Sequence, residues 1–283
     1  MTASSRPQST DRGRPWPIPH EHGAWGLLLQ PFVAAAVLAW RWDFQLIPAF
    51  FLVLLGFLIR EPLVILSRGF WAGHATTGRT QVAVKWLLVE AAGILISLSI
   101  ALRSLPWKPL GALIVVGTIL TVISVWFALE NRQRSIGLQV GAVGGLGSSA
   151  FMSALAATHE VPPWAWLLWT IFVLHGVVSV LCVHARLEMR VATARSTGVD
   201  PRGPATFATI LQFLSAIPIG YYAGFVTAIP IVVSSVIHGI ELRRLASLQN
   251  IRERLQRVGL RMLAVSLAHT LLTIIVLWPW VHR

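Results

Sequence analysis

Apolar runs of about 20 residues, separated by polar segments, recur along the chain from residue 24 onward. A run of that length crosses the hydrocarbon core of a bilayer as an α-helix. The bilayer gives the backbone no water to bond, so each run must pair its own N–H and C=O groups, as a helix does. The pattern predicts nine spans, at residues 24–40, 45–66, 82–102, 110–129, 138–157, 164–183, 205–222, 224–240 and 260–281.

The composition supports this interpretation. Hydrophobic residues make up 55% of the chain and charged residues 12%, with a mean hydropathy of +0.69. A soluble protein carries about twice that charged fraction. We therefore expect an all-α integral membrane protein with one transmembrane domain over residues 23–283. Residues 1–22 are polar and rich in Pro and Arg, without the apolar core of a signal peptide, and predict a disordered cytoplasmic arm.

The basic residues predict the orientation of the nine spans. With the N-terminus inside, 19 of the 23 Lys and Arg residues fall on the inner side and 4 on the outer side. Lys and Arg mark cytoplasmic loops, so the count predicts an N-in, C-out bundle. It also accounts for the net charge of +12 without a nucleic-acid partner, and leaves membrane lipid as the expected partner. The segment between the last two spans has Leu242, Leu245, Leu248, Ile251 and Leu255 at helical spacing, which predicts an amphipathic interfacial helix.

Ionisable residues gather at the inner ends of the even-numbered spans. The second span ends in Arg60-Glu61-Pro62 within an apolar stretch, and intramembrane charges usually face a bundle interior or cavity. Local salt bridges at the headgroups are the alternative, and the sequence leaves both open. The candidate anion-binding residues are Arg60, Glu61, Arg68, His74, Arg79, His184, Arg186, Glu188 and Arg190, with His20, Glu21, His22, Glu130 and Arg134 as secondary candidates.

Local patterns give some of these residues alternative roles. Glu130 and Arg134 share a helix face, as do His184 and Glu188. The histidines of residues 20–22 could bind a metal or cap the first helix. Gly137, Gly141 and Gly145 recur every four residues, which predicts close helix packing.

Two resemblances follow from these motifs. Pro-His-Glu-His-Gly-Ala-Trp at 19–25, with Arg-Glu-Pro-Leu at 60–63, resembles the YwiC-like family of bacterial membrane proteins. That resemblance covers the first third of the chain and implies a bacterial inner membrane location. The overall layout resembles the UbiA superfamily of intramembrane prenyltransferases, which implies a nine-helix bundle whose loops after the second and sixth spans are catalytic.

The UbiA resemblance also implies a site chemistry. In that family two Asp-rich motifs at these loops hold Mg²⁺ on a prenyl diphosphate. The corresponding places here run from Arg60 to Arg79 and from His184 to Arg190, and neither has an Asp cluster. A hard cation prefers carboxylate ligands, and each place has one Glu. The arginines could instead bind an anionic head directly by charge-assisted hydrogen bonds.

Three functions are compatible with this sequence. The first is binding of an isoprenoid diphosphate or another anionic amphiphile in a cytoplasm-facing cavity, with prenyl transfer if the protein is an enzyme. Arg60, Arg186 and Arg190 would hold the head, and Glu61 and Glu188 would orient them or take one metal ion. The second is transport of a small anion or metabolite, and the third is a non-catalytic membrane scaffold.

Overall fold

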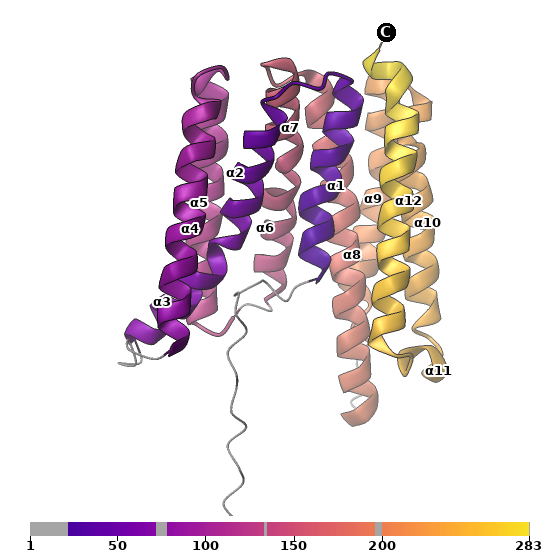
Figure 1. Cartoon of the computed structure of the whole chain (residues 1–283). Helices are drawn as coiled ribbons and strands as arrows, with labels where there is room; N and C mark the ends of the chain where they lie inside the picture. The colour runs from indigo at the N-terminus through magenta and orange to yellow at the C-terminus, as the bar shows by residue number, and fades with distance from the viewer. Residues whose placement is uncertain (1–21, 72–77, 133–134, 196–199, 283) are drawn as a thin grey trace, which may run out of the picture.

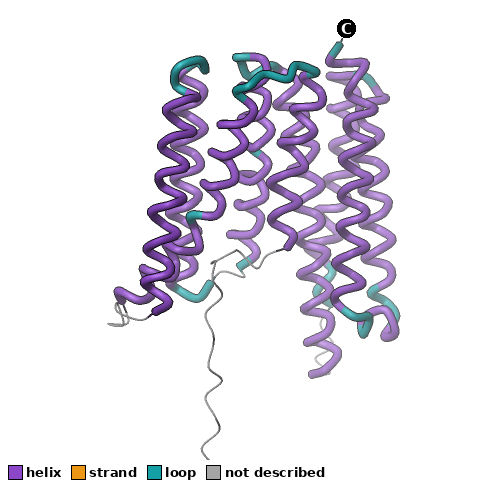
Figure 2. The backbone as a smooth tube through the Cα atoms, viewed as in Figure 1, coloured by secondary structure: helices purple, strands orange, loops and turns teal. Residues whose placement is uncertain are grey.

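The computed structural model describes residues 22–71, 78–132, 135–195 and 200–282. All regular structure in these ranges is helical, with no strand (Figure 2). The helices are α1 (His22–Ala39), α2 (Leu46–Leu58), α3 (Arg60–Trp71), α4 (Gly78–Ala101), α5 (Trp107–Leu129), α6 (Ile136–Gly147), α7 (Ser149–Thr158), α8 (Pro163–Arg195), α9 (Gly203–Ala223), the 3₁₀ turn η1 (Phe225–Ala228), α10 (Ile229–Arg244), α11 (Leu248–Ile251) and α12 (Leu255–Val281).

The helices of the described ranges pass back and forth through one bundle (Figure 1). Eight segments are long and apolar enough to cross a membrane, and the apolar helix at Gly23–Ala39 is shorter. Three of the eight combine two helices each: α2 with α3, α6 with α7, and η1 with α10. These eight segments and α1 coincide with the nine predicted spans, and the all-α membrane fold is confirmed.

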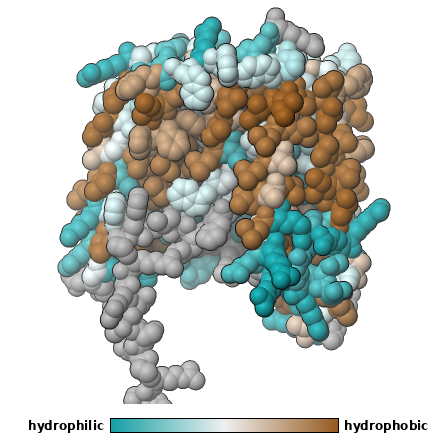
Figure 3. All heavy atoms as spheres, turned by 45° about the vertical axis from the view of Figure 1, so that its right-hand side comes forward, coloured by the Kyte–Doolittle hydropathy of each residue, from teal (hydrophilic) through white to brown (hydrophobic). Residues whose placement is uncertain are grey.

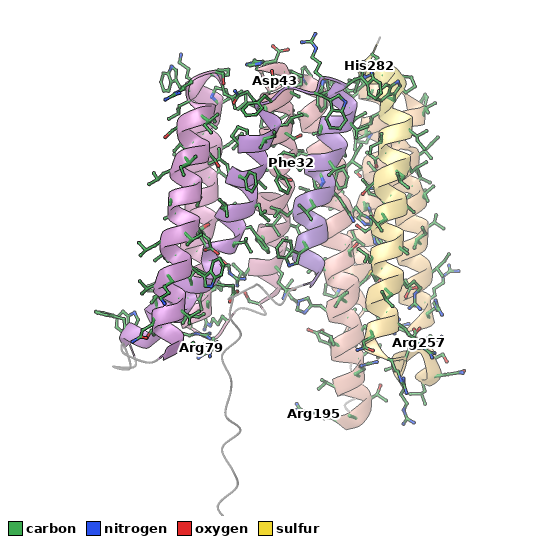
Figure 4. The ribbon with its side chains drawn as sticks, in the orientation of Figure 1. Phe32, Asp43, Arg79, Arg195, Arg257 and His282 are labelled. Atoms are coloured by element: carbon green, nitrogen blue, oxygen red, sulfur yellow. The ribbon has the colours of Figure 1, made fainter. Side chains whose placement is uncertain are left out.

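The two ends of the bundle differ from its middle. Hydrophobic residues form a belt between hydrophilic ends (Figure 3). Asp43 and His282 lie at one end, and Arg79, Arg195 and Arg257 lie at the other, which we call the basic end (Figure 4). This division agrees with the loop assignment that the positive charges predict, in which the basic end is cytoplasmic.

Small side chains bring α1 and α7 into close contact at the centre of the bundle. Nine of the ten residues of α7 are buried. Ala34 and Ala35 of α1 and Ala154 of α7 are fully buried in the same core. The Ser149 hydroxyl donates to the Leu28 carbonyl at 2.7 Å, which joins the two helices. Lipid tails are as apolar as side chains, so close packing and interhelical hydrogen bonds hold such helices together.

Two passes are broken within the membrane. The second breaks between α2 and α3, where Pro62 has no N–H to donate to the preceding turn. The fifth breaks between α6 and α7 at Ser148, whose hydroxyl donates to the Gly145 carbonyl at 2.6 Å. The first break sets Arg60 and Glu61 at the start of a new helix.

The glycines of the fifth pass pack less closely than predicted. A Cβ added at Gly145 would lie 2.3 Å from Leu120 Cδ1, but one added at Gly137 or Gly141 would meet nothing within 4 Å. Another close approach is at Gly176 of α8, where a Cβ would meet two neighbouring helices, at Val143 Cγ1 (2.7 Å) and at a Leu27 methyl (2.8 Å). Four-residue spacing identifies a helix face, but not which glycines of that face meet a neighbour.

The predicted amphipathic helix between the last two spans is not formed. The chain instead leaves α10 at Arg244, makes the four-residue α11 and turns again before α12. Leu242, Leu245 and Ile251 are buried, whereas Leu248 is exposed. Their spacing therefore reflects burial under the ends of neighbouring helices rather than one continuous apolar face.

We predict that Gly176→Ala destabilises the bundle. The added methyl would force Val143 and Leu27 to shift, and overpacking of this kind costs about 1–3 kcal/mol. Thermal unfolding of the purified protein should show a lower midpoint. Gly141→Ala is the matched control, because its Cβ enters open space. Equal midpoints for the two variants would contradict the close approach of α6, α8 and α1.

We also predict that the basic end faces the cytoplasm. In a Cys182→Ser background, which has no other cysteine, Arg103→Cys should react with an impermeant maleimide in intact cells. Arg132→Cys, at the basic end, should react only after the membrane is permeabilised. The reverse pattern would overturn the N-in orientation.

Candidate functional site

Buried charge is concentrated where α8, α10 and α12 reach the basic end. Arg186 of α8 is only 3% exposed. Its Nη2 donates to Glu241 Oε2 of α10 at 3.3 Å, and its Nη1 donates to the Asn250 carbonyl at 2.8 Å. A buried ion pair is tolerated only when further hydrogen bonds offset the loss of water. Arg186 meets that condition and joins three segments.

Arg190, one turn further along α8, binds the chain that connects α10 to α12. Its Nε donates to the Ile251 carbonyl at 2.8 Å, and its Nη2 donates to the Glu253 carbonyl. A one-turn helix such as α11 leaves most of its carbonyls without partners in the helix. The Arg190 side chain supplies a partner for two carbonyls of this segment, so α8 fixes the shape of the connection.

Two more arginines complete the arrangement. Arg261 of α12 contacts Glu241 Oε1 with its Nε at 2.8 Å and Glu253 Oε1 with its Nη1 at 2.9 Å. Arg244 Nη1 lies 3.3 Å from Glu241 Oε1. The Arg–Glu cluster therefore consists of Arg186, Arg190, Arg244, Arg261, Glu241 and Glu253. Four positive charges less two negative charges leave an excess of two positive charges.

A small pocket adjoins the Arg–Glu cluster. It is lined by Cys182, Val183, Arg186, Glu241, Leu242, Leu245, Val258 and Met262. Six of these side chains are apolar or weakly polar, and the two charged ones belong to the cluster. The pocket has apolar walls and one charged side, and its space is about that of one water molecule.

The helices α3 and α5 lie on the opposite side of the bundle from α10 and α12 (Figure 1). Arg60 Nη1 and Glu61 Oε1 form an ion pair at 3.5 Å within α3. Arg68 Nη2 donates to the Ala128 carbonyl at 2.6 Å and to Asn131 Oδ1 at 3.3 Å, and so caps the end of α5. The structure brings Arg186 and Arg190 together with Glu241, but it does not bring Arg60 and Glu61 to them.

The remaining predicted residues take separate positions. His184 Nε2 pairs with Gln139 Oε1 of α6 at 2.8 Å rather than with Glu188, which is exposed. Glu130 is exposed and forms its ion pair with Arg132 at 3.6 Å. Arg79 is exposed. His20, Glu21, His74, Arg134 and the side chain of His22 lie outside the described residues.

Four members of the Arg–Glu cluster were not among the candidate residues of the sequence analysis: Glu241, Arg244, Glu253 and Arg261. Glu253 lies in the segment that was predicted to form an amphipathic interfacial helix. Arg261 was counted only as a topology signal. The sequence offers one signal for these residues. Acidic residues are scarce in the predicted inner segments, so Glu241 and Glu253 each lie close in sequence to several arginines. Among the described residues, no group of three His, Cys, Asp or Glu side chains is arranged to hold a metal ion.

We predict that Glu253→Gln destabilises the protein in a pH-dependent way. The hydrogen bond from Arg261 holds the pKa of Glu253 below its ordinary value of 4.5. The ionised carboxylate therefore contributes stability above about pH 4.5, and this contribution is lost as the pH falls through the lower folded value. At pH 7 the variant should lose about 1.5–3 kcal/mol, the worth of a hydrogen bond to a charged group.

Thermal unfolding at pH 7 and at acidic pH checks this prediction. The gap between wild type and Glu253→Gln should close on acidification. Glu188→Gln replaces an exposed acid at the same end and should have no effect at either pH. A gap that persists at low pH would mean that the side chain acts by packing and not by charge.

Comparison with known proteins finds a family model that is similar to the N-terminal part of the chain. Residues 18–154 match the family model described as YwiC-like protein. The match includes the opening of α1 and the Arg60-Glu61-Pro62 motif, but it ends before the helices that carry the Arg–Glu cluster. No curated protein and no solved structure matches the chain, so the UbiA layout stays a prediction. Over residues 18–154 the chain is therefore similar to the YwiC-like protein family, and the chain is a multi-pass membrane protein.

Proposed function

We propose that the protein binds an amphipathic molecule with a phosphate-type anionic head at the cytoplasmic ends of α8, α10 and α12. Isoprenoid diphosphates and lipid phosphates share this chemistry. The observation that supports the proposal is the pocket whose apolar walls end on the Arg–Glu cluster, with its excess of two positive charges. An apolar tail would lie along Val183 and Met262, and the head would meet the arginines.

The surroundings of the pocket favour an anion. Exposed arginines continue from the Arg–Glu cluster over the neighbouring surface, and hydrophilic residues gather at this corner of the bundle (Figure 3). Each basic residue near the cytoplasmic membrane surface contributes about 1 kcal/mol to attraction of anionic lipid. The exposed residues concerned are Arg195, Arg243, Arg252, Arg254 and Arg257.

The contacts suggest which arginines would bind the head. Arg186 and Arg190 already donate to Glu241 and to backbone carbonyls, so they suit a framework role. The Arg244 side chain is 39% exposed and its contact to Glu241 leaves other donors available. We therefore assign the head mainly to Arg244, with Arg261 beside it. This assignment replaces the sequence-based one, in which Arg60, Arg186 and Arg190 hold the head.

Binding at this site would not need Mg²⁺. Both oxygens of Glu241 contact arginines, and Glu253 pairs with Arg261. A divalent cation would have to displace guanidinium groups from the only acids in the Arg–Glu cluster. Direct charge-assisted hydrogen bonds from arginine to phosphate oxygens suit this arrangement better.

We predict that geranylgeranyl diphosphate and phosphatidic acid raise the thermal midpoint of the purified protein, with or without Mg²⁺. Geranylgeraniol, which has the same tail as the diphosphate and no charge, should not do so. Arg244→Gln should weaken binding about tenfold, because one charge-assisted hydrogen bond is worth roughly 1.5 kcal/mol. The affinities of the two anionic ligands are then compared, and the higher affinity shows whether the site prefers an isoprenoid diphosphate or a glycerolipid phosphate.

Two matched controls sharpen the test. Arg257→Gln removes an exposed charge outside the Arg–Glu cluster and should leave the affinity close to that of wild type. Val183→Trp should block the tail, whereas Val191→Trp, two turns along the same exposed face of α8, should not. Stabilisation by geranylgeraniol alone, or equal affinities for Arg244→Gln and Arg257→Gln, would overturn the proposal.

A further inference from the structure

Three histidines from three helices form a stack inside the membrane-spanning region. The rings of His269 on α12 and His175 on α8 are stacked at 4.1 Å, and those of His175 and His238 on α10 at 5.1 Å. The residues are 4%, 2% and 0% exposed. We call this group the histidine stack. Ionisable residues at this depth are costly and usually mark a functional pathway.

A hydrogen-bonded chain fixes the protonation pattern of His238. Ser234 Oγ donates to the Ile231 carbonyl, so it accepts from Gln212 Nε2 at 2.9 Å. This turns Gln212 Oε1 toward His238 Nδ1 at 3.1 Å, and Nδ1 must donate. In the neutral ring Nε2 is then the acceptor, and it receives the Ser179 hydroxyl at 3.1 Å. The neutral His238 ring thus keeps one basic nitrogen, Nε2, which is hydrogen-bonded to Ser179 of α8.

The charged neighbours of the histidine stack lie toward the basic end of the bundle. His238 lies one helical turn from Glu241, and Ser179 lies one turn from Cys182, and both of these neighbours line the pocket at the basic end. Toward the opposite end the same helices bury Ile231 and Leu277 together with the hydroxyls of Ser234 and Thr273, which donate to carbonyls of their own helices. The charged groups that could pass a proton to the histidine stack therefore lie on the side of the pocket.

Packing alone does not account for the histidine stack. His175 Nδ1 is buried and has no hydrogen-bond partner among the described residues. A buried polar atom without a partner costs free energy that a phenylalanine of similar shape would avoid. The rings lie nearly parallel, so their nitrogens do not converge on one point as metal ligands would. A proton needs no convergence, because an imidazolium can lie against a neutral aromatic ring.

We propose that the histidine stack is an intramembrane proton-binding site that takes up one proton through the pocket at the basic end. A hydronium ion in the pocket gives its proton to His238 Nε2, leaving water and an imidazolium, while Nδ1–H still donates to Gln212. The Ser179 hydroxyl turns its hydrogen elsewhere and accepts from the new N–H. A second proton is excluded because two positive charges 4.1–5.1 Å apart repel strongly.

Charged groups near the histidine stack lie on the side of the pocket. They are Arg186 on α8, Glu241 on α10 and Arg261 on α12, beside the neutral thiol of Cys182, whereas α9 and α1 contribute the neutral Gln212 and Gln30. Glu241 favours an added proton, and the two arginines oppose it. This balance suits a site that is neutral at rest and is filled transiently, as proton-coupled transport requires. This proposal does not require the amphiphile proposed above, although both proposals use the pocket and Glu241.

Nitrogen-15 NMR of histidine-labelled protein in lipid bilayers tests the proposal. Single His→Gln variants assign the three signals. Between about pH 8 and pH 4, we expect the histidine stack to gain one positive charge per molecule and no more. Three rings that all stay neutral while the fold is retained, or more than one charge per stack, would overturn it. His184→Asn, outside the stack, should leave this titration unchanged.

A kinetic measurement tests the route. After a rapid drop in pH, infrared bands of imidazolium report the rate of proton uptake. Met262→Trp fills the pocket and should slow uptake at least tenfold without changing the charge at equilibrium. Val191→Trp, on the outer surface of α8, should not slow it. Equal rates for the two variants would overturn entry through the pocket.

Discussion

The pairing of Arg186 with Glu241 sets much of the structure at the basic end. Arg186 is almost fully buried, and in a medium of low dielectric an unpaired guanidinium there would be strongly destabilising. Its partners come from α10 and from the connection to α12, so the charge holds α8 in register with both. That register forms the pocket, and about three helical turns from Arg186 it places His175 of α8 between the imidazoles of α10 and α12.

The sequence was sufficient for the positions of the spans, and it predicts their orientation, because two strong constraints act on it. Each span must be long and apolar, and loops that stay inside must carry the positive charge. Neither constraint fixes which helices touch. Gly141 and Gly176 are both glycines within spans, yet an added Cβ would meet neighbouring side chains only at Gly176, and no local pattern distinguishes the two positions. The turn at α11 was likewise missed, since buried leucines in a folded connection can imitate a helical stripe.

The candidate site was predictable in part for the same reason. Arg186 and Arg190 are recognisable as charges near an apolar span. Their partners are not, because helical spacing points to Glu188 on the same helix and that residue is exposed. Glu241, whose carboxylate binds Arg186, is 55 residues further along the chain, and Glu253, whose backbone carbonyl binds Arg190, is 63 residues further. Only the packing of α8 against α10 and α12 reveals these pairs.

Glu241 belongs to both proposed sites, and this has a thermodynamic consequence. Its carboxylate neutralises Arg244 and Arg261, and it also lies one turn from His238. An anionic head that drew these arginines away would leave Glu241 less compensated, and a less compensated carboxylate favours a proton on the nearby imidazole. By linkage, a proton in the histidine stack would then strengthen binding of the anion by the same factor. One acid shared between a head-binding pocket and a buried proton site is enough to couple the two, without any change in the fold.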